Sequence, residues 1–375
     1  MRPVLPVAGA LAAACCLAAS AGAAGPSVDA RAWLVVNPAT GDILVSHDDR
    51  YRVPIASITK LMTVIVALQH LKLDQVVSVD PRAAAVGQES VYLQPHQQIT
   101  VSDLLKAALI QSANDAADAL ALATATSFPA FAQMMNAQAA ALGLTDSHFV
   151  RPDGLDAPGE YSSARDVTRL AEVAMRIPIV RKDVGMETGM LADGRELHTW
   201  NDLLGKVPGV FGVKTGHTDR ARWGQVAGIH ADGTTIYATI LGSPSRERRN
   251  ADLQALLAFG IDSYRNVDAI AAGRTYATVA TPYGRGPLGL VAVAPLRALV
   301  RVGVPLTERV IAPEVASLPV RRGQVLGKVR VYSGGRLLGA RELVASRSIA
   351  KPGLASRVGW YAGRTVHHVV SMVTP

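Results

Sequence analysis

The sequence predicts an α+β fold, in which helices interrupt and cover a sheet, followed by a small all-β domain. Apolar, strand-like runs lie near both ends of the first 270 residues, and the stretch between them is mostly helical in pattern. Beyond residue 270 the chain is rich in valine and glycine and alternates in short runs. With 375 residues, of which 49% are hydrophobic and 18% charged, the chain is long enough for two or three domains.

The first predicted element is a β-hairpin over residues 31–46, where two apolar runs flank a turn. The run after Ser57, residues 61–68, is apolar nearly all round, which predicts a buried central helix. Further helices are expected over 99–127, beginning at the start signal of residues 100–103, over about 129–142, and from 163 to 175. The later elements are expected in this order: a strand within 207–216, a hairpin of 225–230 and 234–241, a closing helix over about 250–264 and, in the all-β domain, a hairpin of 326–332 and 336–344.

The first 24 residues have the pattern of an export signal, with Arg2, an apolar stretch and a small-residue cleavage site. Both cysteines, Cys15 and Cys16, lie in this stretch, so the mature chain is expected to hold no disulfide, thiolate nucleophile or cysteine metal site. Lipid attachment at Cys15 is an alternative. Ala12 disfavours lipid attachment, because a bacterial lipoprotein signal usually has a large aliphatic residue three positions before the cysteine.

The last segment, residues 351–375, predicts an amphipathic helix. Leu354, Val358 and Tyr361 share one side with later apolar residues, and Arg357 lies on the other. The segment is too polar to span a bilayer. It fits a helix lying in the membrane interface, with its cations among anionic headgroups; the alternative is a helix docked on the protein's own surface. The formal net charge of +8 fits an anionic membrane surface, and no basic, aromatic-interleaved block predicts nucleic-acid binding.

The chemistry centres on Ser57, which is followed three residues later by Lys60 at the start of the buried helix. Residues i and i+3 share a helix face, so the amine can lie beside the hydroxyl and accept its proton if burial lowers the pKa of Lys60. The pattern alone is weak, because Ser57 could be a plain helix cap and Lys60 a solvated lysine. A second copy at 348–351 precedes Pro352 and no apolar helix, and we interpret it as accidental.

Three short motifs occur in chain order, at residues 57–60, 112–114 and 214–216, and together they are far more specific than any one of them. On these motifs the chain resembles the low-molecular-mass penicillin-binding proteins that are D-alanyl-D-alanine carboxypeptidases. The similar segments are 54–63, 112–117, 161–166, 212–218 and, past residue 270, 322–327. The resemblance implies a β-lactamase/transpeptidase-like α/β sandwich with a helical subdomain over 25–270, preceded by the signal peptide over 1–24 and followed by an all-β domain over 271–350 and a membrane-associating tail over 351–375.

The family's activity is removal of the terminal D-alanine from peptidoglycan stem peptides, and its members are acylated by β-lactam antibiotics. The resemblance implies that Ser57 is the nucleophile, Lys60 its base and Ser112 a relay that passes a proton from Lys60 to the departing amine. The backbone amides of Ser57 and His217 would hold the oxyanion. The other implied substrate contacts come from Asn114, Lys214, Thr215, Gly216 and Arg249; the match of Arg249 is softer, because Arg248 is adjacent. No metal or cofactor is implied, and the expected location is the periplasmic face of the inner membrane.

Two departures from the family pattern stand out. Residues 220–223 place arginines and Trp223 where small residues are usual, which could narrow the cleft or alter substrate preference, and Arg151 replaces a common asparagine. Three alternatives stay open: a D,D-endopeptidase, a β-lactamase and a non-enzymatic penicillin-binding scaffold. A class A β-lactamase is disfavoured, because no Glu-x-x-Leu-Asn pattern occurs between Asn114 and Lys214.

Overall fold

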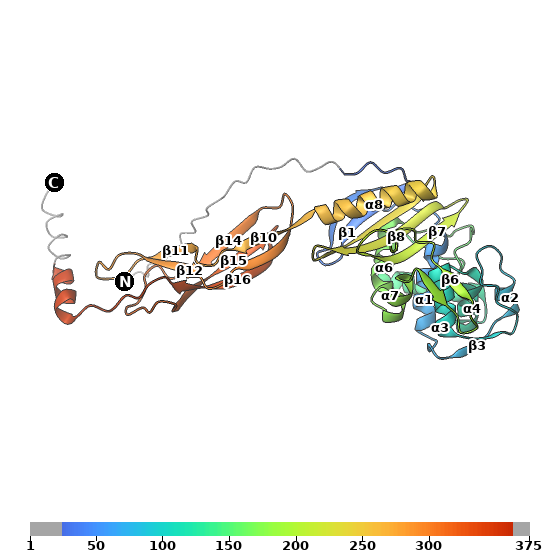
Figure 1. The fold of residues 1–375 in the computed structure, drawn as a ribbon, viewed down its shortest axis with the longest axis horizontal. Coiled ribbons are helices and arrows are strands. Elements are labelled where there is room, and N and C mark those ends of the chain that lie inside the picture. The colour runs from blue at the N-terminus through green and yellow to red at the C-terminus, as the bar shows by residue number, and fades with distance from the viewer. Residues whose placement is uncertain (1–24, 363–375) are drawn as a thin grey trace, which may run out of the picture. The chain divides into compact units, whose positions relative to one another are not determined.

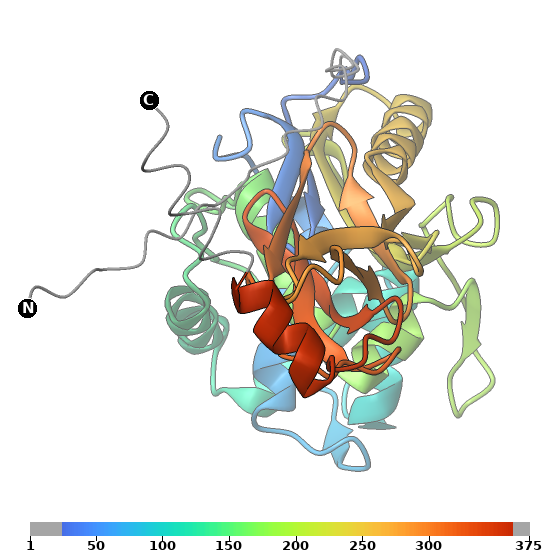
Figure 2. The same cartoon turned by 90° about the vertical axis from the view of Figure 1, so that its left-hand side faces the viewer.

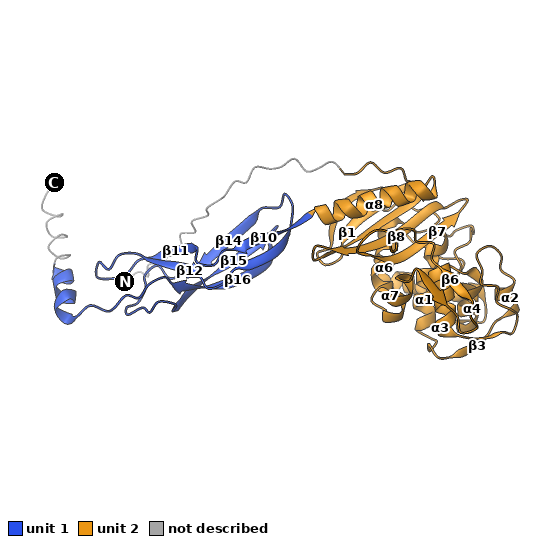
Figure 3. Ribbon diagram, viewed as in Figure 1, with its two compact units in different colours: residues 1–23, 264–375 blue, residues 24–263 orange. Residues whose placement is uncertain are grey.

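The structure, a computed structural model, describes residues 25–362 (Figure 1). The chain divides into two compact units, which meet in the sequence between Ser263 and Tyr264 (Figure 3). The export signal predicted over 1–24 and the last part of the predicted tail helix, 363–375, lie outside the described residues. Strand β10, Tyr264–Ile270, belongs to the second unit, because it pairs with β13, Leu296–Arg301.

The first unit is built on a five-stranded antiparallel sheet in the order β2-β1-β9-β8-β7. The predicted hairpin near the start of the chain is confirmed, and β1 pairs with β9, so both ends of the unit meet in one sheet. One face of the sheet is covered by α8, and the other helices lie on the opposite side (Figure 1). The strands are β1 (Ala32–Asn37), β2 (Asp42–His47), β7 (Val210–Thr218), β8 (Arg222–Ala231) and β9 (Thr234–Ser243).

The helix after Ser57 is α1, Lys60–Leu68, and eight of its nine residues are buried, which confirms the predicted central helix. A 3-10 turn, η1 (Ala56–Thr59), precedes it and carries Ser57. The remaining helices are α2 (Pro81–Ala84), α3 (Val101–Lys106), η2 (Ala107–Gln111), α4 (Asn114–Thr124), α5 (Phe128–Leu142), α6 (Ala164–Ala174), α7 (Pro178–Val184) and α8 (Arg246–Asp262). Two short antiparallel pairs accompany them: β3 (Val76–Ser78) with β4 (Gln98–Thr100), and β5 (Thr188–Met190) with β6 (Glu196–His198).

The prediction of one helix over 99–127 is wrong, because the chain breaks at Ser112. This residue has a left-handed backbone with φ 66° between η2 and α4. The run of alanine and leucine continues across the break, and hydrophobic periodicity therefore does not reveal it. The predicted start is confirmed, since the Thr100 hydroxyl accepts a hydrogen bond from the Asp103 amide. Helix α8 begins at Arg246, earlier than expected, because Ser245 caps it by accepting from the Arg248 amide.

The second unit is all-β. Five strands form one antiparallel sheet in the order β11-β12-β16-β15-β14, and β10 and β13 form a separate pair. The predicted hairpin is β15 with β16, and small apolar side chains such as Val329, Val331 and Leu343 fill the core between the layers. The strands are β11 (Thr275–Val279), β12 (Leu288–Ala292), β14 (Leu306–Ile311), β15 (Val325–Ser333) and β16 (Arg336–Ala345).

After the second unit's last strand, residues 354–362 form the described part of the tail helix, the red helix facing the viewer in Figure 2. Within residues 25–362, none of the helices combines the length and the apolar character needed to cross a bilayer.

Candidate active site

The turn that carries Ser57 is held in place by close backbone packing. Ala56 has a left-handed backbone with φ 50° immediately before the serine. Gly216, on β7, lies so near this turn that a Cβ there would come 2.5 Å from the backbone oxygen of Ile55. A side chain at Gly154, which has φ +79°, would overlap the backbone oxygen of Ala56. Gly216, the glycine of the third motif, is therefore required for a structural reason: β7 approaches the turn that carries Ser57 too closely for a side chain.

Lys60 is fully buried and its Nζ has three neighbours at hydrogen-bond distance: Ser57 Oγ, Asn114 Oδ1 and the backbone oxygen of Asp153, each 2.7 Å away. The two carbonyl oxygens can only accept, so they take two N–H bonds. A neutral amine then has one lone pair left, and it faces the Ser57 hydroxyl. Burial lowers the pKa of Lys60 to about 8, against the opposing charges of nearby carboxylates. This is the arrangement a base needs to accept the proton of Ser57.

The second predicted lysine, Lys214 on β7, is also buried. Its Nζ donates to Ser112 Oγ at 2.8 Å and to the backbone oxygen of Thr215 at 3.2 Å. Burial, and next the charge of Lys60, lower the pKa of Lys214 well below its ordinary value. Among the contacts within residues 25–362, Ser112 is bonded to Lys214 and not to Lys60. The three motifs thus form two adjoining pairs, Ser57 with Lys60 and Ser112 with Lys214, and Asn114 bonds to the first lysine.

A cavity of about 240 Å³ opens beside these pairs. It is lined by six residues that the sequence predicted, Ser57, Ser112, Thr215, Gly216, His217 and Arg249. It is also lined by Trp223, from the segment expected to narrow the cleft, and by three residues that the sequence did not assign to the site: Gln88, Glu89 and Trp200. Lys60, Asn114 and Lys214 are buried; Lys60 is bonded to Ser57 and Lys214 to Ser112, and Asn114 is bonded to Lys60.

Trp223 belongs to the unusual segment after the third motif, and the structure places it in the cavity wall. Its ring stacks on His217, with the ring centroids 3.9 Å apart, because the two residues are paired across β7 and β8. The Arg249 guanidinium lies 5.6 Å from the centre of the Trp223 ring. The departure from the family pattern therefore contributes an aromatic wall to the site.

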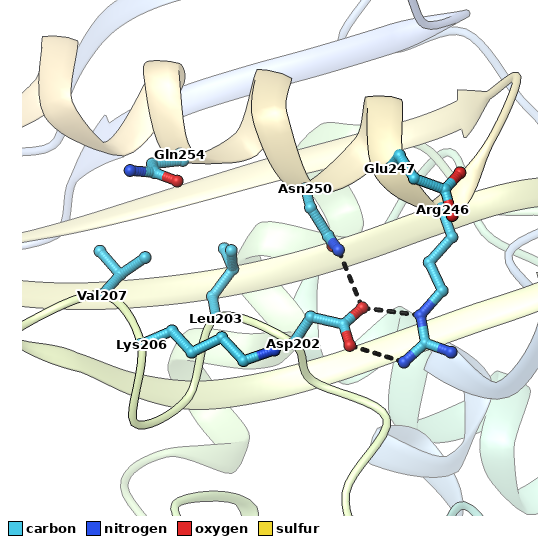
Figure 4. A pocket seen from close by; sticks show the side chains of 8 residues that line it. All are labelled: Asp202, Leu203, Lys206, Val207, Arg246, Glu247, Asn250 and Gln254. Carbon is cyan, nitrogen blue, oxygen red and sulfur yellow. Dashed lines mark hydrogen bonds and ion pairs between the residues drawn. The ribbon is translucent and has the colours of Figure 1, made fainter.

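The structure distinguishes Arg249 from its neighbour. Arg249 is 1% exposed and lines the cavity, whereas the half-exposed Arg248 pairs with Asp252 along α8. Asp202, which the sequence analysis missed, holds Arg249 by accepting from its Nη2 at 3.0 Å. The same carboxylate accepts from Arg246 and Asn250, as Figure 4 shows beside the neighbouring surface pocket. The cluster of arginines at the start of α8 signals an acidic partner, but no local pattern identifies Asp202.

Behind Lys60 lies a set of buried acids that the sequence analysis also missed. Arg151, noted as a departure, binds the Asp153 carboxylate with two hydrogen bonds of 2.9 and 2.5 Å. Glu160 accepts from Thr59 and from the Arg151 amide, and burial raises the pKa of Glu160 to about 7. Asp118 has a buried Oδ1 without a partner in the described part of the chain, and burial and then Asp153 raise its pKa to about 8. These groups surround the loop whose backbone oxygen at Asp153 receives Lys60.

The fold and the site together define a serine peptidase whose nucleophile and base are a serine–lysine pair. The pair lies at a cleft between the sheet and the helical region. The chain belongs to the Peptidase S11 family, described as D-alanyl-D-alanine carboxypeptidase, whose model matches residues 19–245. It is accordingly a serine-type D-Ala-D-Ala carboxypeptidase of the low-molecular-mass penicillin-binding proteins, which act on peptidoglycan.

Relatives match over most of the chain. D-alanyl-D-alanine carboxypeptidase DacC of Escherichia coli (strain K12) is 31% identical over 359 residues, which cover 89% of this chain and 87% of the relative. The crystal structure of penicillin binding protein 5 from Haemophilus influenzae superimposes with a TM-score of 0.64 at 25% identity, covering 88% of this chain and all of that one. Penicillin-binding protein D2 from Listeria monocytogenes, in its ampicillin-bound form, has a TM-score of 0.57 at 30% identity and covers 62% of this chain and 98% of its own. The predicted α+β fold with an all-β second domain is confirmed.

Proposed function

We propose that this carboxypeptidase works through an acyl-enzyme on Ser57. The Ser57 oxygen attacks the carbonyl between the two terminal D-alanines, and Lys60 takes the hydroxyl proton through the 2.7 Å contact. The C–N bond breaks, the terminal D-alanine leaves with a proton on its amine, and water then hydrolyses the ester. The observation that carries this proposal is the Lys60 environment, in which two carbonyl acceptors leave the amine lone pair for the serine.

The developing negative charge on the carbonyl oxygen needs donors. We assign them to the backbone amides of Ser57 and His217, since β7 runs beside the nucleophile turn at Gly216. One such donor is worth about 3–4 kcal/mol of barrier. Ser112 is the group that protonates the departing amine, and its bond to Lys214 supports this role because the lysine can restore its proton.

The terminal carboxylate of the substrate is bound by Lys214, Thr215 and Arg249, and Asn114 binds the peptide in addition to Lys60. Arg249 and Thr215 line the cavity, and the Lys214 amine is one hydrogen bond behind Ser112. A carboxylate next to Lys214 favours its charged form, and that charge lowers the pKa of Lys60 further. Substrate binding thereby promotes the neutral base at the moment it is needed.

The two enzymatic alternatives find less support. A rapidly turning over β-lactamase needs a carboxylate that activates water in the cleft, and Glu160 is buried in bonds to Thr59 and Arg151 instead. Of the ten cavity-lining residues, Glu89 is the one carboxylate. A D,D-endopeptidase uses the same machinery on a longer substrate, and the relatives matched over both units are named carboxypeptidases. The same serine is expected to be acylated by β-lactams, and the relative from Listeria monocytogenes was solved in an ampicillin-bound form.

We also propose that the tail attaches the exported protein to the periplasmic face of the inner membrane, with residues 1–24 as its export signal. In the described part of the tail helix, Leu354, Val358 and Tyr361 are 76%, 66% and 56% exposed. Arg357, Trp360 and also Tyr361 lie against Tyr283 of the same unit. The exposed apolar side chains of Leu354 and Val358 support interfacial binding.

The mechanism is tested by intact-protein mass spectrometry with a diacetyl-Lys-D-Ala-D-Ala peptide and with penicillin. We expect a covalent adduct on Ser57 with penicillin, release of one D-alanine per peptide, and neither in Ser57→Ala. Labelling or D-alanine release that survives in a folded Ser57→Ala protein would refute the assignment.

A further inference from the structure

We propose that Glu89 is a specificity-determining residue that binds a cationic amine carried by the substrate on the acyl side of the bond that is cut. This inference rests on the proposed function, because it concerns the substrate of the same cleft. The substrate class it selects is a peptide whose side chain before the two D-alanines ends in a free amine.

Glu89 has an unusual position for an acidic side chain. It lines the cavity that also contains Ser57, Ser112 and Thr215, and it is exposed. Among residues 25–362 no ion pair involves Glu89, whereas other carboxylates near the cavity, such as Asp202, are paired with arginine. Its charge also acts on both buried lysines, since it raises the pKa of Lys60 and of Lys214 against the effect of burial. The cavity therefore contains one carboxylate that has no ion-pair partner among the described residues.

The loop that carries Glu89 is rigidly tied to the second motif. The Asn114 amide donates to the backbone oxygen of Glu89 at 2.8 Å, and Asn114 Nδ2 donates to the backbone oxygen of Gly87 at 3.1 Å. The fully buried Asp115 then accepts from Ser90 Oγ and from the amides of Val91 and Leu93, at 2.5 to 3.2 Å. The first turn of α4 thus positions this loop as firmly as it positions Asn114 beside Lys60.

The distribution of charge decides which end of a peptide Glu89 meets. Arg249, presented from α8, together with Thr215 and Lys214 from β7, suits the terminal carboxylate, and a carboxylate beside Glu89 would be repelled. Glu89 comes from the loop before β4, on the helical side, and approaches the cavity from a different element than Arg249. A peptide that ends at Arg249 and reacts at Ser57 therefore has its preceding residue available to Glu89. An amine there would form a partly exposed ion pair, which is worth roughly a three- to fivefold preference at low salt.

The experiment compares two peptides that differ in one charge: acetyl-Lys-D-Ala-D-Ala with a free ε-amine, and the diacetyl form without it. The full-length protein is assayed for D-alanine release as wild type, Glu89→Gln and Asp232→Asn. Asp232→Asn is the matched control, because Asp232 is an exposed acid outside the cavity lining. It lies in the β8–β9 turn, eight residues after Gly224, which pairs with the cavity residue Gly216. We expect the wild type and Asp232→Asn to prefer the free amine about three- to fivefold in kcat/KM at low salt and less at high salt. Glu89→Gln should bring the ratio close to one.

The decisive quantity is the ratio of kcat/KM for the free-amine peptide to kcat/KM for the diacetyl peptide. Glu89→Gln also removes a charge that acts on Lys60 and Lys214, and this effect changes the rates for both peptides by the same factor. A wild type without preference, or a Glu89→Gln protein that keeps it, overturns the inference. An equal loss on both peptides, with the wild-type preference kept, also overturns it, because that result reflects only the charge of Glu89 acting on the two lysines. Penicillin labelling of Ser57 distinguishes a failure of this inference from a failure of the proposed function. A Glu89→Gln protein that labels normally but loses the preference supports this inference. A wild type that neither labels nor releases D-alanine refutes the proposed function and this inference with it.

Discussion

Gly154 lies so close to Ala56 that no side chain fits between them. A Cβ on Gly154 would overlap the Ala56 backbone oxygen and come 2.9 Å from Cβ of Thr59. The contact joins the loop that receives Lys60, through the Asp153 oxygen, to the residue that precedes the nucleophile. The serine and its base are therefore positioned by the same backbone contact.

Gly154→Ala is expected to lower the rate of acylation by penicillin about 10- to 100-fold, because displacement of the nucleophile turn by a fraction of an ångström misaligns Ser57 and Lys60. Gly143→Ala is the matched control. Gly143 has φ +72° but no atom within 4 Å of its Cβ position. It should therefore show only the cost of a left-handed alanine, about 1–2 kcal/mol of stability, and acylate normally. Equal acylation rates in the two variants would contradict the assigned role of the contact.

The activity should rise with pH through the pKa of Lys60. Because burial lowers that pKa to about 8, kcat/KM below pH 8 should increase about tenfold per pH unit and level off above it, as the neutral amine becomes the main form. Penicillin acylation of the free enzyme between pH 6 and 9.5 measures this directly. Lys60→Arg should be inactive across the range, since a guanidinium keeps its proton. A flat wild-type profile would exclude Lys60 as the titrating base.

Arg249→Ala should raise KM for a peptide that ends in a free carboxylate about 10- to 100-fold, the range for losing a hydrogen bond to a charged group. A peptide that ends in D-alanine amide should be affected much less. Arg248→Ala is the control, because Arg248 lies outside the cavity lining and pairs with Asp252. If Arg248→Ala reproduces the loss, the sequence match to Arg249 is misplaced by one residue.

The raised pKa of Asp118 predicts that the free energy of unfolding falls as pH rises. Burial holds its pKa at about 8 in the folded chain, far above the ordinary 3.8, so between pH 4 and 8 the folded state keeps a proton that the unfolded state releases. The free energy of unfolding should therefore decrease in this window, with a limiting slope of about 1.4 kcal/mol per pH unit for one proton. Urea unfolding at pH 5, 6.5 and 8 should show a smaller decrease in Asp118→Asn. Asp232→Asn should keep the wild-type slope, and an unchanged slope in Asp118→Asn would mean that another group titrates.

Removal of residues 354–375 should abolish binding to vesicles that contain anionic lipid and leave hydrolysis of short D-Ala-D-Ala peptides within about twofold of the full chain. Leu354 and Val358 of the described tail are exposed, so their side chains can enter an interface. Co-sedimentation of the mature protein, with and without the segment, measures the effect. Continued sedimentation of the truncated protein would show that the tail is not the anchor.

Much of the fold follows from local pattern. The hairpins β1–β2 and β15–β16 and the helices α1, α5 and α6 are where alternation, turns and caps indicated them. The break at Ser112 was missed because the apolar run continues across it, and its left-handed backbone depends on packing around η2 and α4. Similarly, the start of β8 at Arg222, three residues earlier than expected, and the short pairs β3–β4 and β5–β6 depend on neighbours that are distant in sequence.

The sequence by itself determined the reacting groups, since three motifs in order specify a serine, two lysines, a second serine and an asparagine. The spacing of Ser57 and Lys60 also predicted that these two side chains pair, whereas only the tertiary structure decided the longer-range contacts, with Asn114 on Lys60, Lys214 on Ser112, and Asp202 holding Arg249. The physical reason is that a pKa and a hydrogen bond depend on burial and on contacts made across 50 to 100 residues of chain. Such contacts leave no local signal, so neither the acids behind Lys60 nor Glu89 in the cavity wall was visible before the chain was folded.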